Sequence, residues 1–335
     1  MALKIGIDLG SSNVRICTNK KGIIIDEPNV VAINILDQQI MAVGSEAKSM
    51  LGRTPEGVMA AYPLSDGVIA SYKITKQMLQ VYLNKIVGKI RLFKPDIVIN
   101  VPVGATSTEK KAIIDVIEAV GARKAYLFKS PLAAALGAGI DISSPNGNMV
   151  IDIGGGKTEV AVISLGDIVS FSSVRYGGKK FDEAIVDYVR KKHSLIIGEQ
   201  TAEQVKIEIG SAITTKKELK MEVSGSNTVS GLPESLILTT ADVVLAIKPV
   251  INEIILAVKQ VLQKTPPELS SDIMDRGMVI AGSGGNLRNF DELLTMVTGV
   301  PCQMAERPER ATISGIKLAV DNFQDFINSF VWRTK

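Results

Sequence analysis

The chain has 335 residues, of which 46% are hydrophobic, so it can bury a sizeable core and has room for about two domains. Its formal net charge is +3, with acidic and basic residues intermixed, and this pattern gives no reason to expect nucleic acid as a partner. The single histidine, His193, ends a helical pattern, which argues against histidine-dependent catalysis and against a zinc site.

The cysteines and the N-terminus predict a reducing, cytoplasmic compartment. Cys17 and Cys302 lie far apart without CxxC spacing, and the opening residues MALKIGIDLG show no signal-peptide pattern. The most apolar long segment, VVLAIKPVINEIILAVKQVL, is interrupted by Lys248, Glu253 and Lys259. A membrane span needs about 20 apolar residues, so no transmembrane helix is predicted.

A strand-hairpin-strand unit occurs twice in the sequence, first at the N-terminus and again near the middle of the chain. The first copy is KIGIDLGSSNVRICTNKKGIIIDEPNVVAI and the second is MVIDIGGGKTEVAVISLGDIVSFSSVRYGG. In both copies an apolar strand ends in Ile-Asp, a small-residue turn follows, and an alternating strand leads into a third strand. Asp8 and Asp152 are therefore equivalent, and the repeat predicts two related domains, each with its own sheet.

Helices and buried strands fill the intervals, which predicts an α/β fold. Ser107 is the expected N-cap of the helix STEKKAIIDVIEAVGA, and further helices are expected in FDEAIVDYVRKKH and TAEQVKIEIGSA. The runs PDIVINVP and GMVIAGSGG are typical of strands buried on both faces. The segment LKMEVSGSNTVSGLPESLIL predicts a β-meander in a peripheral subdomain. At the C-terminus, FQDFINSFVWRTK has aromatic residues near helical spacing and predicts a helix, either packed on its own domain or lying at a membrane interface.

The run Gly154-Gly155-Gly156-Lys157-Thr158 looks like the end of a phosphate-binding P-loop, but two features exclude one. Position 151 is isoleucine where GxxxxGK[ST] requires glycine, and the following residues TEVAVISLG alternate like a strand instead of opening a helix. The segment is therefore predicted to be a strand-turn-strand.

Two such turns can still bind phosphate, because successive backbone N–H groups in a glycine turn form an anion-accepting concavity. The turns DLGSSN and DIGGGKT belong to equivalent strands, so facing copies would clamp a polyphosphate. Asp8 and Asp152 suit Mg²⁺, held through its water molecules. A third glycine cluster, IAGSGGNL, suits the nucleoside or α-phosphate, and Glu203 and Lys206 lie one helical turn apart, where they can reach ribose and adenine.

These motifs resemble those of the actin, sugar-kinase and heat-shock-chaperone ATPase superfamily, and within it the bacterial actins of the MreB family. The match rests on the two turns and on long stretches such as AVGSEAKSMLGRTPEGVMAAYPLSDGVIA, VINVPVGATSTEKKA, SPLAAALGAG, GEQTAEQVKIEIGSA and ERPERATISGI. The resemblance implies an actin-like fold of two domains with ribonuclease-H-like cores and a nucleotide cleft between them. Its expected parts are residues 1–141 with a subdomain at about 33–70, residues 142–320 with a subdomain at about 179–245, and a C-terminal helix, 321–335, returning to the first domain.

The resemblance also assigns roles to single residues around ATP or ADP and Mg²⁺. The metal ligands are Asp8 and Asp152, and the degenerate catalytic residues are Ser130, Lys157 and Thr158. The nucleotide-binding positions are Asp8, Gly10, Ser11, Ser12, Asn13, Asp152, Gly154, Gly155, Gly156, Lys157, Thr158, Gly177, Gly178, Glu203, Lys206, Gly282, Ser283, Gly284 and Gly285.

Three departures from the family pattern bear on hydrolysis. Ser130 replaces the family's water-positioning glutamate, and Lys157 replaces the threonine that assists it. Loss of a general base slows a reaction by roughly 10²–10⁴-fold. Lys157 is expected to sit against the γ-phosphate, and Lys179, in place of an aspartate, adds another positive charge near the cleft. ATP binding is therefore expected with weak hydrolysis; a non-hydrolysing filament scaffold and, less so, a small-molecule kinase remain as alternatives.

The partners implied by the resemblance are further copies of the chain, in paired filaments that govern cell shape, other MreB paralogues, and the inner face of the cytoplasmic membrane. Leu92 and Phe93 lie between cations in KIRLFKPD. Apolar residues flanked by cations suit insertion into an anionic interface, and a strand start packed in the core is the alternative. The expected location is cytoplasmic and peripheral at the membrane.

Overall fold

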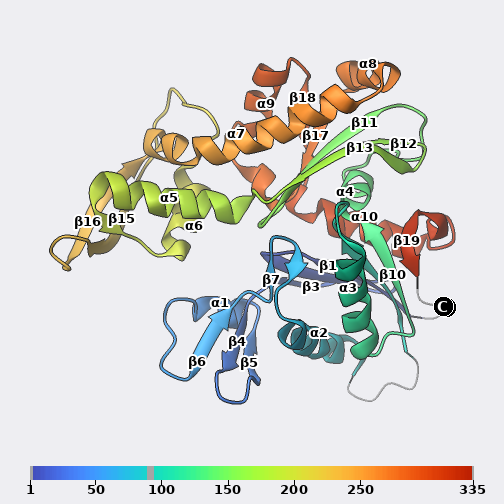
Figure 1. Cartoon of the computed structure of the whole chain (residues 1–335), viewed down its shortest axis with the longest axis horizontal. Coiled ribbons are helices and arrows are strands. Elements are labelled where there is room, and N and C mark those ends of the chain that lie inside the picture. The colour runs from blue at the N-terminus through green and yellow to red at the C-terminus, as the bar shows by residue number, and fades with distance from the viewer. Residues whose placement is uncertain (1–2, 89–93, 334–335) are drawn as a thin grey trace.

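In the computed structural model of the chain, which describes residues 3–88 and 94–333, two large sheets face each other across a pair of helices (Figure 1). The first sheet has the order β19-β10-β9-β1-β2-β3. The strands β1, β2 and β3 form an antiparallel meander, and β1, β9 and β10 run parallel. Their bounds are β1 (Lys4–Leu9), β2 (Asn13–Thr18), β3 (Gly22–Pro28), β9 (Asp96–Val101), β10 (Lys124–Lys129) and β19 (Phe330–Arg333).

The second sheet repeats this topology with the order β13-β12-β11-β17-β18. Here β11, β12 and β13 form the antiparallel meander, and β11, β17 and β18 run parallel. The predicted repeat is thus present as two sheets of matching strand order, in an α/β fold. The bounds are β11 (Asn148–Ile153), β12 (Thr158–Ser164), β13 (Asp167–Val174), β17 (Met278–Ala281) and β18 (Cys302–Met304).

Helices α4 (Ser130–Gly137) and α10 (Ala311–Asp321) lie between the two sheets (Figure 1). Their buried side chains form one core cluster with residues of β9 and β10 on one side and of β11, β12 and β17 on the other. The two helices touch through backbone: a Cβ on Gly137 would lie 1.8 Å from the carbonyl oxygen of Ala311, and a Cβ on Gly315 would lie 1.8 Å from that of Ala133. The crossing therefore requires glycine at both positions.

The outer faces of the sheets are covered by amphipathic helices. Leu79 and Leu83 of α2 and Ile113 and Ile117 of α3 pack into the core of the first sheet. The N-cap of α3 is Thr106, which forms a capping box with Glu109, so the sequence-based choice of Ser107 is one residue late. The covering helices are α2 (Tyr72–Val87), α3 (Ser107–Ala119), α7 (Thr240–Lys264), α8 (Pro267–Arg276) and α9 (Phe290–Thr298).

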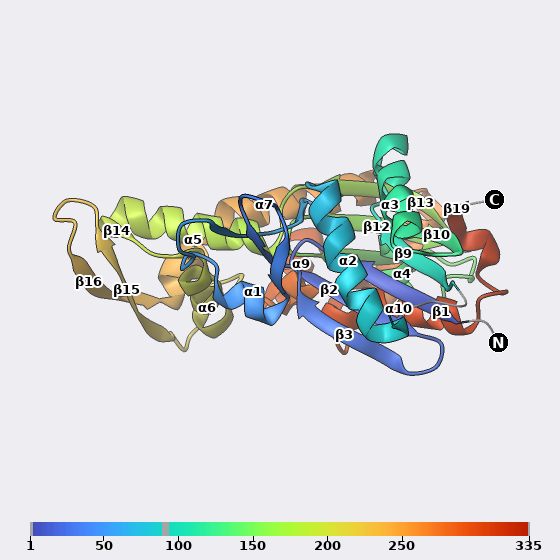
Figure 2. The ribbon, with the colours of Figure 1, turned by 90° about the horizontal axis from the view of Figure 1, so that it is seen from below.

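Two smaller units extend from the sheets, and the whole molecule is flat when seen from below (Figure 2). One contains the sheet β5-β4-β6 with α1 and the hairpin β7-β8, and the other contains the sheet β14-β15-β16 beside α5 and α6. The predicted β-meander corresponds to the β15-β16 hairpin. Bounds are β4 (Val31–Asn34), β5 (Ile40–Val43), α1 (Ser45–Ser49), β6 (Val58–Ala61), β7 (Leu64–Ser65), β8 (Val68–Ile69), α5 (Gly178–His193), β14 (Leu195–Ile196), α6 (Glu199–Ile209), β15 (Lys220–Asn227) and β16 (Pro233–Thr239).

The predicted helix over residues 321–335 is wrong. After α10 the chain makes a short 3₁₀ turn at Ile327–Ser329 and then forms strand β19, which pairs antiparallel with β10. Phe323 and Phe330 pack against the ring of Tyr126, with centroids 4.9 and 5.4 Å away. The β-branched and aromatic run that begins at Phe330 suits an edge strand, and the burial of these rings fixes it there.

Within residues 3–88 and 94–333, no helix has the length and apolar character needed to cross a membrane. This agrees with the charged interruptions seen in the longest apolar segment, which forms α7.

We predict that Gly315→Ala lowers the free energy of unfolding by about 1–3 kcal/mol or more, because its new methyl group would have to displace the backbone of α4. Urea-induced unfolding followed by circular dichroism measures this. Gly104→Ala is the matched control, since its nearest atom would be 3.9 Å away, and it should change stability by about 0.5 kcal/mol or less. Equal stability of the two variants would contradict a tight helix crossing.

Candidate functional site

The β1–β2 turn and the β11–β12 turn face each other and are closed in the same way. The amide of Gly10 donates to the carbonyl of Asn13 at 3.0 Å, and the amide of Gly154 donates to the carbonyl of Lys157 at 2.9 Å. Each turn joins two antiparallel strands, and residues 154–158 open no helix. The exclusion of a P-loop is therefore confirmed.

The two turns also touch. A Cβ on Gly155 would lie 1.8 Å from Ser12 Oγ, and a Cβ on Gly156 would lie 2.7 Å from Ser11 Oγ. The Ser11 hydroxyl in addition accepts a hydrogen bond from the amide of Gly67, at 2.7 Å, in the β7–β8 turn. Glycine is required at this contact because any side chain would push the two halves of the molecule apart.

A deep cleft lies around these turns. Its larger part has a volume of about 940 Å³, and a smaller cavity of about 80 Å³ adjoins it at the turns. The predicted residues that line the smaller cavity are Asp8, Gly10, Ser11, Ser12, Asn13, Ser130, Asp152, Gly154, Gly155, Gly156, Lys157, Gly282 and Ser283. Those that line the larger part are Ser12, Asn13, Gly155, Gly178, Glu203, Lys206, Ser283 and Gly284.

Three predicted residues lie behind the cleft wall instead of lining it. The Thr158 hydroxyl is buried and donates to the carbonyl of Tyr176 at 2.7 Å. Gly177 packs beneath the second turn, where a Cβ would meet the carbonyl oxygen of Gly154 at 2.5 Å, and Gly285 packs against Ile280. These positions support the shape of the cleft.

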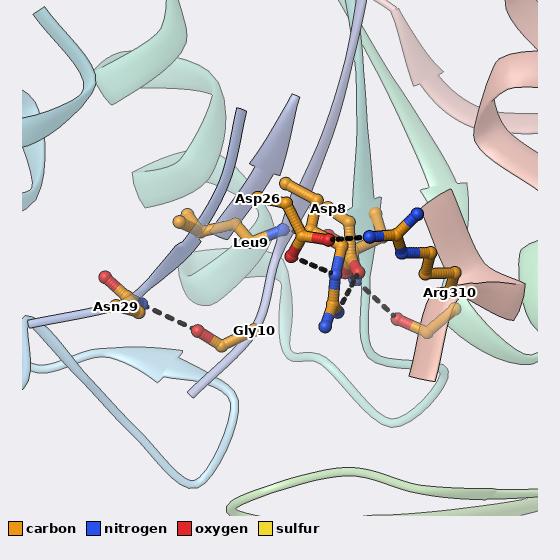
Figure 3. Close-up of polar contacts among 9 residues, drawn as sticks. Asp8, Leu9, Gly10, Asp26, Asn29 and Arg310 are labelled. Carbon is orange, nitrogen blue, oxygen red and sulfur yellow. Dashed lines mark hydrogen bonds and ion pairs between the residues drawn. The ribbon is translucent and has the colours of Figure 1, made fainter. Parts of the chain in front are cut away.

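Asp8 is fixed at the end of β1 by the neighbouring strands (Figure 3). Its Oδ1 accepts a hydrogen bond from Asn100 Nδ2 at 2.9 Å, and Asn100 Oδ1 accepts one from the amide of Leu9 at 2.8 Å. Its Oδ2 lies 3.7 Å from Nη1 of Arg15. Burial raises the pKa of Asp8, and the positive charge of Arg15 opposes that shift.

Arg15 belongs to a ladder of alternating charges that runs from Asp8 through Asp26 to Arg310, the three members that Figure 3 labels. Its Nε donates to Asp26 Oδ1 at 2.8 Å, and Asp26 Oδ2 pairs with Arg310 Nη2 at 3.0 Å. Arg15 lines both parts of the cleft. A guanidinium group is therefore part of the cleft wall, which the motifs alone did not reveal.

Asp152 differs from Asp8 in having a carboxylate without a hydrogen-bonding partner in the part of the chain that the structure describes. Burial, and next the negative charge of Glu159, raise the pKa of Asp152 to about 7. No cluster of three or more His, Cys, Asp or Glu side chains within the described residues is arranged to ligate a metal directly. The symmetric pair of free carboxylates that the resemblance implies for Mg²⁺ does not fit this arrangement, because both oxygens of Asp8 are engaged.

Lys157 points toward its own domain's Glu159, with which it forms a short ion pair. Glu159 is 1% exposed, and its other oxygen accepts a hydrogen bond from the amide of Val103, which follows β9, at 2.7 Å. The stem of Lys157 packs against Gly67. The group therefore connects both halves of the molecule beside the turns.

Ser130 begins α4 and is buried at the floor of the smaller cavity. Its hydroxyl donates to the carbonyl of Val101 at 3.1 Å and lies 3.4 Å from Asn100 Nδ2. A neutral serine hydroxyl is far too weak a base to take a proton from water, so Ser130 cannot activate one.

The opposite wall of the cleft comes from α5 and α6. Lys206 Nζ donates to Asp182 at 2.7 Å and to the carbonyl of Gly178 at 3.1 Å. Glu203 pairs with Lys48 of the other half at 2.7 Å. Burial raises the pKa of Asp182 to about 6, against the effect of Lys206. Glu203 and Lys206 thus share a helix face at the cleft, each with a charged partner.

Lys179 also reaches the other half of the molecule. Its ammonium lies 3.1 Å from the ring centroid of Tyr62, a cation–π contact across the cleft. Burial lowers the pKa of Lys179 to about 8, although four carboxylates act in the opposite direction. Leu92 and Phe93, the predicted membrane residues, lie outside the described residues.

A comparison of the sequence with known protein families matches residues 2–328 to the family described as MreB/Mbl protein. The chain is 43% identical over 321 residues to the cell shape-determining protein Mbl of Bacillus subtilis (strain 168), covering 96% of both chains. It is 48% identical over 311 residues to the cell shape-determining protein MreB of Haemophilus influenzae, covering 91% of this chain and 89% of the relative.

The chain belongs to the MreB/Mbl family. Its fold is the actin-like fold of a solved relative, MreB5 of Spiroplasma citri bound to ADP, with a TM-score of 0.93, 32% identity and coverage of 98% of this chain and 99% of that one. The same relative bound to AMPPNP gives a TM-score of 0.91. The MamK double helical filament shares the fold at 20% identity, with a TM-score of 0.77.

Several cleft residues of this MreB/Mbl chain escaped the motif analysis. Asp8 precedes the Ser11-Ser12 turn by as many residues as Arg15 follows it. In an antiparallel hairpin such residues lie opposite each other, so the sequence contains a signal for this pair. Lys157 directly precedes β12 and Glu159 is the second residue of that strand, and this spacing of two opposite charges is also a readable signal. The contacts of Asn100 and Tyr62 depend on the packing of distant segments and left no local signal.

We predict that Lys157→Met destabilises the protein by about 3–5 kcal/mol, because it leaves the buried Glu159 carboxylate without its counter-charge. The double variant Lys157→Met/Glu159→Gln should recover most of this loss, since the amide oxygen can still accept from Val103. Lys180→Met, which breaks an exposed pair with Glu183, is the control and should cost about 1 kcal/mol or less. Urea-induced unfolding measures all three, and an undiminished loss in the double variant would argue against the ion pair.

A second prediction concerns pH. The pKa of Lys179 falls from its ordinary 10.5 to about 8 in the folded state, so between these values the unfolded chain binds more protons and stability rises with pH. Lys179→Met should therefore be more stable than wild type near about pH 7, with a gain that shrinks toward about pH 10. Unfolding midpoints without nucleotide test this. The exposed Lys191→Met is the control, and a constant gain across the range would refute the interpretation.

Proposed function

We propose that this MreB/Mbl chain binds ATP or ADP in the cleft between its two sheets. The observation that carries the proposal is the pair of equivalent glycine turns, which line one cavity from both halves of the molecule. Amides of such turns that are not used to close them can donate to phosphate oxygens. The adjoining volume of about 940 Å³ leaves room for a nucleoside. Solved structures of a relative that is 32% identical contain ADP and AMPPNP, which supports the same ligand class here.

The proposed role is assembly into cytoskeletal filaments that act in cell shape. Two curated relatives at 43% and 48% identity are named cell shape-determining proteins, and they match nearly the whole chain. The chain would assemble with further copies of itself or with MreB paralogues, in the cytoplasm and at the inner face of the membrane. The proposed membrane contact is Leu92 and Phe93, which lie outside the described residues.

Hydrolysis is proposed to be slow. The resemblance expects a water-orienting glutamate and threonine at positions 130 and 157. Ser130 stands there instead, with its hydroxyl donating a hydrogen bond to the carbonyl of Val101, and so does Lys157, which is paired with Glu159. Neither group can accept a proton from water in this arrangement. The chain would then work as a nucleotide-gated scaffold with little turnover. If Mg²⁺ accompanies the nucleotide, Asp152 would hold it through water.

The test combines sedimentation with phosphate release. We predict that the wild-type chain pellets in an ATP-dependent manner while releasing phosphate slowly. In Ser130→Glu/Lys157→Thr/Glu159→Gln we expect phosphate release to rise by about 10²-fold, because the variant restores a base at position 130 and a hydroxyl at position 157, while Glu159→Gln avoids leaving a buried carboxylate without its counter-charge. Gly104→Ala serves as the control and should behave like wild type. Phosphate release without pelleting would refute the filament function, and absence of ATP binding would refute the whole proposal.

A further inference from the structure

The position of Arg15 follows from strand register. In the β1–β2 pair, Asp8 lies directly opposite Arg15, and in the β2–β3 pair Arg15 lies opposite Asp26. Side chains directly opposite in an antiparallel pair lie on the same face of the sheet. The arginine is therefore placed between two carboxylates by the sheet itself, with only 9% of its side chain exposed.

This placement changes what Asp8 can do. Its Oδ2 faces the Arg15 guanidinium at 3.7 Å and its Oδ1 accepts from Asn100 at 2.9 Å. A divalent cation drawn to Asp8 would meet a fixed positive charge on the adjoining strand, and like charges a few ångströms apart repel strongly in a partly buried site. A guanidinium group is also a good phosphate ligand, because it is always charged and offers several donors in one plane.

Arg15 in addition lines both the cavity at the turns and the larger part of the cleft. We infer that Arg15 supplies the positive charge at the phosphate end of the cleft that a divalent cation would otherwise bring, so that this chain binds nucleotide with little dependence on Mg²⁺. The inference rests on the proposed nucleotide binding and adds to it a specific side chain and a specific ionic requirement.

A purely structural role for Arg15 predicts a different experimental result. If the ladder from Asp8 through Arg15 and Asp26 to Arg310 served only to hold strands together, its loss would change the stability of the fold. It would leave the ratio of nucleotide affinities with and without Mg²⁺ unchanged. That ratio therefore separates the two roles.

The experiment is a fluorescence titration of the full chain with N-methylanthraniloyl-ATP, once with excess Mg²⁺ and once with EDTA. For wild type we expect the two dissociation constants to differ by less than about tenfold. For Arg15→Leu we expect the affinity in EDTA to fall by about 10- to 100-fold, the range for loss of a charged hydrogen bond, while the affinity with Mg²⁺ changes much less. Arg15→Lys should retain most of the affinity in EDTA.

The matched control is Arg190→Leu, which removes an arginine from an exposed ion pair with Asp187 far along α5 and should leave both constants unchanged. Binding of wild type only in the presence of Mg²⁺ would overturn the inference and leave the proposed function standing. Absence of binding in both buffers would overturn the proposed function itself. If circular dichroism shows that Arg15→Leu does not fold, wild type and Arg15→Lys still test the inference. A loss of nucleotide affinity in EDTA by either of them would contradict it.

Discussion

The crossing of α4 and α10 is the contact on which the rest of the molecule depends. Each helix presents a glycine to the backbone of the other, and several alanines of both helices lie in the same cluster, so the two helices approach closely. Because both sheets bury their inner faces against this one layer, they share a core. The hairpin turns at the ends of β1 and β11 then face each other at a separation at which Ser11 and Ser12 fill the space opposite Gly155 and Gly156. The geometry of the cleft at these turns thus originates in two small residues outside it.

A second constraint is charge pairing inside the cleft. Arg15, Lys157 and Lys206 each have a carboxylate partner, and Lys179 rests on an aromatic ring. Buried ion pairs gain little net stability because desolvation offsets the attraction, but they fix the positions of the charges. A polyphosphate entering this cleft would meet cations that are already oriented and would compete with carboxylates for them. Affinity and selectivity then depend on that competition more than on the number of positive charges.

Local sequence patterns predicted most of the fold and part of the candidate site. Alternation around the two aspartates predicted both hairpins, and the residues after Gly156 excluded a P-loop, because hairpins are set by neighbouring residues. The direction of Lys157 was not predictable from its type alone: the γ-phosphate was the expected partner, and Glu159 is the one in the structure. The C-terminal strand was missed because the aromatic spacing suits a helix as well as an edge strand, and only β10, distant in sequence, decides between them.

The return of the chain to its first sheet has a consequence for biosynthesis. Strands β1, β2, β9 and β10 leave the ribosome early, but α10 and β19, which cover one face and one edge of their sheet, come from residues 311–333. Until those residues are made, α4 lies on the inner face of the first sheet without α10 beside it, and β10 lacks its edge neighbour β19. The edge and the helix-covered face of the first sheet are therefore completed late in synthesis, and until then they stay open to pairing with wrong partners.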